Sequence, residues 1–307
     1  MWQSGRLFVK SVDDSAMKSR RLSTQREWTA RVLRVLDFIT EHLADDLPLT
    51  RLARVGAFSP FHFHRVFQAQ TGETVRAFVA RKRVERAMLL LGRGASPRRL
   101  TDLELELGFS SSAEFSRAFR GHTGLPPSKF RQNKVRKNSP KPTPHPPGHA
   151  APLRVRLISR PERRIAFVSV TDCFSPGVLL DATHALDDWR AKAGLASGPW
   201  FGSSSDDPFV TAPELCRYEL GLEVPTSARG AGRVHTRSVA ASLRAELAVH
   251  GGPTEIDLGW TRLFAEWLPG SGCELEHAPA EERFATRPDF ESPTPFDIVL
   301  SLPVHQR

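Results

Sequence analysis

The stretch FHRVFQAQTGETVRAF, residues 63–78, returns 52 positions later as FSRAFRGHTGLPPSKF, residues 115–130. Both copies fit the pattern F-x-R-x-F-x-x-x-T-G-x-x-x-x-x-F. Such internal similarity indicates that one structural unit is used twice. The matched residues are Phe63, Arg65, Phe67, Thr71, Gly72 and Phe78 in the first copy and Phe115, Arg117, Phe119, Thr123, Gly124 and Phe130 in the second.

Each copy predicts an amphipathic helix that ends at a glycine. In the first copy Ser59 is a suitable N-cap, Pro60 fits the first helical position and Gly72 supplies the C-terminal stop. Phe63 and Phe67 fall on one face, which we expect to be buried. The opposite, outer face carries Phe61, His64, Arg65 and Gln68 in the first copy and Ser112, Ala113, Ser116, Arg117 and Arg120 in the second.

A short apolar helix is expected before each of these helices, ending near Gly56 and Gly108. A helix, a tight turn and a second helix with a basic outer face form a helix-turn-helix unit, whose second helix enters the major groove of DNA. One copy alone fits a helical bundle with a solvated basic face equally well. Two copies with arginine at the same outer register favour DNA binding.

Residues 75–91 predict a helix that connects the two units. Such a helix can hold two reading helices about 34 Å apart, which is one turn of DNA. Because the two outer faces differ in sequence, the expected DNA site is asymmetric.

The charge is divided between two regions of the chain. Residues 26–137 contain 21 Lys and Arg against 11 Asp and Glu, whereas residues 153–307 contain 16 against 21. The net charge of +9 therefore combines a basic half with an acidic half. Only the basic half has the charge expected of a phosphate binder.

Residues from about 32 to 131 resemble the DNA-binding domain of AraC/XylS-type transcriptional regulators. The likeness is carried by GFSS (108–111), FSRAF (115–119) and TGLPPS (123–128). It implies seven helices with two helix-turn-helix units, promoter DNA as partner and RNA polymerase as a further candidate partner. It also implies base contacts from Phe61, His64 and Arg65 in one groove segment and from Ser112, Ala113, Ser116 and Arg117 in the next.

Two acidic residues of the second unit stand out against this resemblance. Glu104 occupies a position where the family usually has alanine, so its carboxylate must tilt outward or find a partner. The second unit is therefore expected to dock less tightly than the first. Glu114 lies beside the reading face, where accepting from cytosine and repelling DNA are equally good interpretations.

The rest of the chain divides at a proline-rich segment. Residues 1–25 are expected to form a disordered leader and residues 26–132 the all-α DNA-binding domain. Six prolines within 133–152 indicate a semi-rigid linker. Residues 153–307 are expected to form an α+β domain of two pseudo-symmetric repeats, which makes the protein multidomain.

Residues 155–304 resemble the gyrase-inhibitor-like (GyrI-like) effector-binding domain. The likeness is carried by DDP (206–208), CRYE (216–219), HGGP (250–253) and WLPGSG (267–272). It implies a cleft between the repeats that holds small, often cationic or aromatic ligands beside a glutamate. That glutamate is Glu282, with Phe284 where tyrosine is usual. Thr254 also replaces a usual tyrosine, and Phe174 takes the matching place in the first repeat.

The chemistry of Glu282 fits a cation site, because a poorly solvated carboxylate among aromatic rings attracts a cation that can also lie on those rings. A solvated carboxylate at a strand edge is the alternative. Rings are available from Trp189, Trp200, Trp260 and Trp267, although tryptophans at helical spacing belong more often to the core.

Other classes of site are not expected. His62 and His64 are two apart on a helix and point in different directions, so they do not suit a metal, and no cofactor is expected. The three cysteines are widely spaced, which fits a reducing cytoplasm. No apolar run approaches membrane length.

The leading hypothesis is a transcriptional regulator whose acidic domain senses a small molecule, without enzymatic activity. One alternative is a DNA-binding protein whose C-terminal domain hydrolyses reactive small molecules, with Glu282 as general acid or base. Another is an architectural protein that binds DNA with little specificity.

Overall fold

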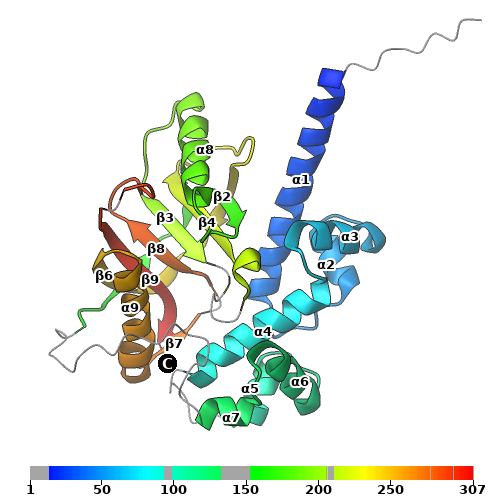
Figure 1. The fold of residues 1–307 in the computed structure, drawn as a ribbon, viewed down its shortest axis with the longest axis vertical. Coiled ribbons are helices and arrows are strands. Elements are labelled where there is room, and N and C mark those ends of the chain that lie inside the picture. The colour runs from blue at the N-terminus through cyan, green and yellow to red at the C-terminus, as the bar shows by residue number, and fades with distance from the viewer. Residues whose placement is uncertain are drawn as a thin grey trace, which may run out of the picture.

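A computed structural model describes residues 14–92, 99–132, 153–204, 206, 211–276, 278–292 and 294–306. It consists of a helical domain packed beside one end of an antiparallel sheet domain (Figure 1). The predicted linker at 133–152 lies outside the described residues. The leader prediction is wrong for residues 14–25, which begin the first helix.

The helical domain contains the elements expected from the repeat. Its bounds are α1 (Asp14–Glu41), α2 (Leu49–Val55), α3 (Pro60–Thr71), α4 (Val75–Gly92), α5 (Leu100–Glu106), α6 (Ser112–Thr123) and α7 (Pro127–Gln132). The two sequence copies fall in α3 with the start of α4 and in α6 with the start of α7, and the short helices α2 and α5 precede them as expected. In Figure 1, α3 and α6 both lie on the side of this domain away from the sheet.

The helical domain has two hydrophobic cores, and α4 contributes to both. Val75, Phe78 and Val79 pack with α1, α2 and α3 around Phe63 and Phe67. Farther along α4, a second cluster joins Val84, Ala87 and Met88 to Leu103, Leu107, Phe109, Phe115 and Phe119. With 18 residues, α4 is about 27 Å long and rigidly connects the two helix pairs.

The sheet domain has a single main sheet in which neighbouring strands are antiparallel. The described strands follow the order β1-β6-β9-β8-β3-β4-β2-β5, and β7 pairs with β9. Their bounds are β1 (Arg156–Arg160), β2 (Arg163–Thr171), β3 (Trp200–Ser204), β4 (Arg217–Val224), β5 (His235–Val239), β6 (Ser242–Gly251), β7 (Cys273–Leu275), β8 (Ala280–Phe284) and β9 (Phe296–Gln306).

Helices α8 (Val178–Lys192) and α9 (Pro253–Arg262) cover one face of this sheet. They enclose the main core, which includes Leu186, Leu220 and Leu300. On the opposite face Ile165, Phe167 and Phe201 pack against Leu33 of α1. The helical domain therefore contacts the sheet directly through α1. Among the described residues, no helix is both long and apolar enough to cross a membrane.

Candidate DNA-reading face and small-molecule cavity

The first candidate reading helix, α3, is built as its sequence predicts. The Ser59 side chain accepts from the backbone N–H of His62 at 3.4 Å, and Gly72 ends the helix with a φ of 76°. Phe63 and Phe67 are fully buried, whereas the predicted DNA contacts Phe61, His64 and Arg65 are exposed. The Arg65 guanidinium lies 5.5 Å from the centre of the Phe61 ring, so these two groups form one surface.

The second candidate reading helix, α6, repeats this construction. Ser111 caps its start, and Gly124 ends it with a φ of 72°. Phe115 and Phe119 point into the core, and the predicted contacts Ser112, Ala113, Ser116 and Arg117 are all exposed. The two predicted faces therefore occupy equivalent positions and differ in chemistry, one with a stacked Phe-Arg pair and one with small side chains beside an arginine.

The repeated Thr-Gly pair has a structural cause. The Thr71 hydroxyl donates to the carbonyl of Phe67 at 2.8 Å, and the Thr123 hydroxyl donates to that of Phe119 at 2.7 Å. Each hydroxyl satisfies a carbonyl in the last turn of its helix before the left-handed glycine reverses the chain. The Thr-Gly pair thus serves helix termination, independently of DNA contact.

Glu104, which stands where alanine was expected, forms a hydrogen bond within the α5–α6 pair. It is buried, and its carboxylate accepts a hydrogen bond from the Ser112 hydroxyl at the start of α6. Glu114 is likewise engaged, since it accepts from the backbone N–H and hydroxyl of Ser110 at 3.0 and 2.6 Å. Those hydrogen bonds lower the pKa of Glu114, which keeps its negative charge at the helix N-terminus.

A cavity of about 540 Å³ lies between the sheet, α8 and α9 on one side and residues of α1 and α4 on the other. All three residues predicted to bind ligand line it, namely Glu282, Phe284 and Phe174. Phe284 is buried and lies edge-on to Phe296, with ring centres 5.7 Å apart. Phe174 is 62% exposed. The structure therefore brings the three together.

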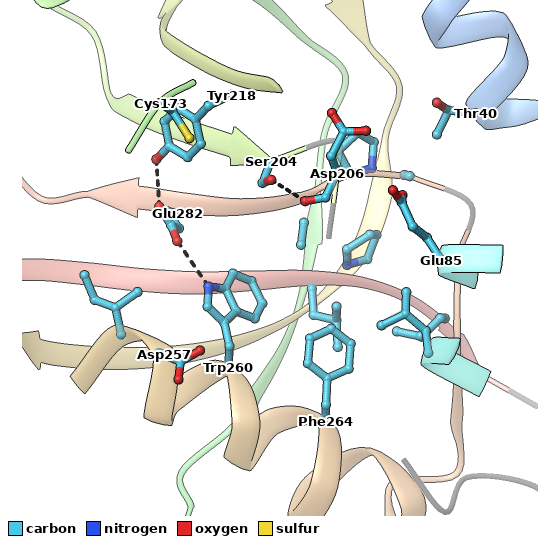
Figure 2. A pocket seen from close by; sticks show the side chains of 18 of the residues that line it. Thr40, Glu85, Cys173, Ser204, Asp206, Tyr218, Asp257, Trp260, Phe264 and Glu282 are labelled. Carbon is cyan, nitrogen blue, oxygen red and sulfur yellow. Dashed lines mark hydrogen bonds between the residues drawn. The ribbon is translucent and has the colours of Figure 1, made fainter. Parts of the chain in front are cut away.

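Glu282 is a partly exposed carboxylate that lines this cavity together with the buried Lys82, Glu85 and Asp206 (Figure 2). Its Oε2 accepts from the Tyr218 hydroxyl at 2.7 Å and its Oε1 accepts from Trp260 Nε1 at 3.2 Å. Burial raises the pKa of Glu282, although both hydrogen bonds act in the opposite direction. Burial and the adjacent Glu282 also raise the pKa of Tyr218 well above its usual value, so its hydroxyl remains a donor.

The interpretation of Glu282 as a solvated edge residue is wrong. Strand β8 lies inside the sheet between β9 and β3, and Glu282 is opposite Gly202 in the β3 register. A Cβ at Gly202 would lie 1.6 Å from the Tyr218 hydroxyl oxygen. Gly202 therefore leaves the space through which Tyr218 reaches Glu282, a requirement that sequence reasoning missed.

The four tryptophans divide between core and cavity. Trp260 lines the cavity, whereas Trp189 and Trp200 are buried in the main core. Trp267 packs against that core from a partly buried position. Sequence reasoning also missed Phe290 and Phe296, which add to the apolar wall around Phe284.

Asp206, the first residue of the DDP run, joins the two domains. Its carboxylate accepts from Arg217 Nε and Nη2, both at 2.8 Å, and from Arg81 Nη1 of α4 at 2.9 Å. Burial alone would raise the pKa of Asp206, but Lys82, Arg217 and Arg81 hold that pKa well below its usual range. The carboxylate is thus a buried anion shared by both domains.

A second, smaller interdomain cavity of about 410 Å³ lies between α1 and the other face of the sheet. Arg237 of β5 and Asp37 of α1 face each other there at 3.5 Å. Burial raises the pKa of Asp37 to about 6, against the opposing influence of Arg237.

Comparisons with known proteins separate the same two parts. Residues 52–133 match a helix-turn-helix domain family, and residues 154–305 match the GyrI-like small molecule binding domain family. Over 100 residues the chain is 30% identical to the uncharacterized HTH-type transcriptional regulator YbfP of Bacillus subtilis, covering 33% of each protein. Over 94 residues it is 31% identical to the probable transcriptional regulator LumQ of Photobacterium leiognathi, covering 31% of this chain and 37% of LumQ.

A solved structure of a probable AraC family transcriptional regulator from Rhodopseudomonas palustris is 29% identical. The matched region covers 34% of this chain and 96% of the chain in that structure, with a TM-score of 0.32. The chain spans about a third of the length of the curated relatives named above. It combines a helix-turn-helix domain with a cavity-bearing sheet domain. In family terms, it joins an AraC-type helix-turn-helix domain to a GyrI-like small-molecule-binding domain.

Proposed function

We propose that the protein is a sequence-specific transcriptional regulator that binds promoter DNA through α3 and α6 and responds to a small cationic or aromatic ligand held beside Glu282. The observation that carries the proposal is the desolvated Glu282 carboxylate, hydrogen-bonded to Tyr218 and Trp260 in a largely apolar cavity, in a chain that also presents α3 and α6 to solvent. RNA polymerase is the machinery on which a bound regulator would act.

The DNA-binding part of the proposal treats α2–α3 and α5–α6 as two helix-turn-helix units. It assigns base contacts to Phe61, His64 and Arg65 on α3 and to Ser112, Ala113, Ser116 and Arg117 on α6. An arginine can pair bidentately with guanine, and small side chains can contact a thymine methyl or a phosphate. Because the Ser112 hydroxyl already donates a hydrogen bond to Glu104, α6 is expected to make its polar base contacts chiefly through Ser116 and Arg117.

The ligand-binding part treats the sheet domain as two related repeats with the ligand between them. The order β2-α8-β3-β4 is similar to the order β6-α9-β8-β9, apart from the additional short strand β7 before β8, and this similarity supports the division. Glu282 would attract the cation of a ligand, and Trp260, Phe284 and Phe174 would contact its apolar surface. The raised pKa of Glu282 supports this role, since a cation relieves the cost of an ionised buried carboxylate.

The DNA-binding proposal is tested by selecting bound sites from random DNA and footprinting them across a salt series. A regulator keeps one asymmetric protected site of about two helical turns at salt concentrations where non-specific binding has faded. Protection without sequence preference at every salt concentration would instead indicate an architectural protein.

A hydrolase acting on reactive small molecules is the second candidate function. The hydrogen bond from Tyr218 to Glu282, together with the raised pKa of Glu282, would suit a general acid or base. Incubation of the full chain with strained-ring alkylating compounds distinguishes the two functions. Turnover that disappears in Glu282→Gln would favour the enzyme, whereas turnover at the uncatalysed rate eliminates it.

A further inference from the structure

The cavity that contains Glu282 is lined by both domains. Besides the sheet domain, its wall includes Thr40 near the end of α1, Leu43 in the turn that follows, and Lys82, Glu85, Arg86 and Leu89 of α4. Figure 2 shows Glu282 and Trp260 toward one end, with Thr40 and Glu85 at the other. A ligand that fills the cavity from end to end would therefore touch the helical domain directly.

The α4 wall is held in place by buried ion pairs. Lys82 Nζ lies 2.6 Å from Glu85 Oε2 and 3.6 Å from Asp206 Oδ1. Arg81 Nη1 contacts Glu85 Oε1 at 2.5 Å and Asp206 Oδ1 at 2.9 Å. These side chains are all at least nine-tenths buried, so separating them would leave uncompensated charges. A ligand consequently meets a fixed wall at this end of the cavity.

The same helix supports both reading helices. The Phe78 ring lies edge-on to the Phe67 ring of α3, with centres 5.5 Å apart. Near the other end of α4, Met88 packs in the cluster that contains Phe115 and Phe119 of α6. A displacement of α4 would therefore reach the packing beneath both reading faces.

Leu89 is the apolar member of the α4 wall. It is partly buried and packs against the sheet-domain cluster that contains Phe264, Leu268 and Leu302. The other described α4 residues that line the cavity are charged, and Lys82 and Glu85 are engaged with each other. The apolar end of a ligand is thus expected to lie against Leu89, while its cation lies near Glu282.

We propose that the ligand site is composite, with α4 of the DNA-binding domain forming its far wall and Leu89 limiting the size of the ligand. This inference rests on the proposed ligand-sensing function and adds that the ligand is a hydrophobic cation bulky enough to reach from Glu282 to α4. The bound molecule contacts the helix that positions α3 and α6, without any intermediate segment.

The test compares two permanent cations of different size, tetraphenylphosphonium and benzyltrimethylammonium, by calorimetric titration of the full chain. Leu89→Trp should weaken tetraphenylphosphonium binding at least tenfold and change benzyltrimethylammonium binding by no more than about twofold. Leu89→Ala should leave both cations bound at least as tightly as in the wild type. Arg76→Ala, which alters an exposed residue of α4 away from the cavity, is the matched control.

The outcomes separate this inference from the function on which it rests. Suppose that Glu282→Gln weakens the binding of both cations, while Leu89→Trp binds both as tightly as the wild type does. The cavity then binds cations, but α4 is not part of the site. If the wild-type protein binds neither cation, the cation-sensing proposal fails and the composite site fails with it. Leu89→Ala controls for damage to the fold. A general loss of structure would weaken the binding of both cations in both Leu89 variants.

Discussion

Arg81 of α4 donates from Nη1 to Oδ1 of Asp206 at 2.9 Å, and this hydrogen bond joins the helical domain to the sheet domain inside the protein. The same carboxylate also accepts from Arg217. Asp206, in the loop after β3, thereby connects α4, which packs against both α3 and α6, to β4, the strand that contains Tyr218. The interface and the candidate ligand site are consequently built from neighbouring residues.

The Asp206→Ala variant should lose about 3–5 kcal/mol of unfolding free energy, since it leaves Arg81, Lys82 and Arg217 buried without their shared anion. Urea denaturation at pH 7 measures the loss. Asp181→Ala is the control, because it removes an exposed ion pair with Arg233 and should cost less than about 1 kcal/mol. Equal losses in the two variants would contradict the assigned role of Asp206.

Glu282 should make the protein less stable as pH rises. Its pKa is raised by folding, so above pH 4.5 the folded state retains a proton that the unfolded state has released. The contribution of the protonated Glu282 to stability is fully present below pH 4.5. It is lost as pH rises through the folded-state pKa of Glu282. Glu282→Gln should remove this decline.

The decline is measured as unfolding free energy between pH 4 and pH 8. Both proteins should carry Asp37→Asn, because burial also raises the pKa of Asp37, to about 6, and contributes a decline of the same sign. The exposed Glu291→Gln is the control. A Glu282→Gln profile parallel to that of its parent would show that Glu282 is not the titrating group.

Gly202→Ala should disconnect Tyr218 from Glu282, since the added methyl group occupies the position of the tyrosine hydroxyl. We expect a loss of about 1–3 kcal/mol in stability, the cost of an unsatisfied buried polar group. We also expect weaker binding of tetraphenylphosphonium. Gly121→Ala, at a helical position with no atom within 4 Å of the new Cβ, should be neutral or slightly stabilising. Unchanged cation binding in Gly202→Ala would remove Tyr218 from the site.

Both proposed reading faces should depend on their arginines, but only α3 should also depend on an aromatic ring. Arg65→Ala and Arg117→Ala should each weaken binding to the selected DNA by about 1–3 kcal/mol, or about 5- to 150-fold. Phe61→Ala should weaken binding as well, because the Phe61 ring orients Arg65, whereas Ala113 offers α6 no such ring. Gel-shift titrations at one fixed salt concentration measure these effects, with Arg233→Ala in the sheet domain as control. Losses of equal size in Arg233→Ala would indicate a general charge effect.

The helical domain was predictable because each part of its repeat has a local cause. The Phe63 and Phe67 spacing identifies the buried face of α3, and the Thr71–Gly72 pair identifies where that helix ends. The same reasoning applied 52 residues later finds α6. The helical nature of residues 14–25 was not predictable in this way, because that segment is polar and lacks a strong apolar face.

The candidate ligand site was predictable only by resemblance, and its strand β8 was not recognised. The segment Ala280–Phe284 is rich in charge, so hydrophobic alternation gives no signal for a central strand. Its glutamates are accommodated by partners far away in sequence, since Arg163 and Arg244 contact Glu281 and Tyr218 contacts Glu282. The interdomain role of Asp206 likewise depends on Arg81, 125 positions earlier.

Linkage between the two domains is tested most directly by the Kd for selected DNA, measured with and without saturating tetraphenylphosphonium at one salt concentration. A shared α4 wall predicts a change of at least about fivefold, and Glu282→Gln should abolish that change. An identical Kd in the presence of calorimetrically confirmed tetraphenylphosphonium binding would contradict the claim that the cavity beside Glu282 controls the DNA-reading helices.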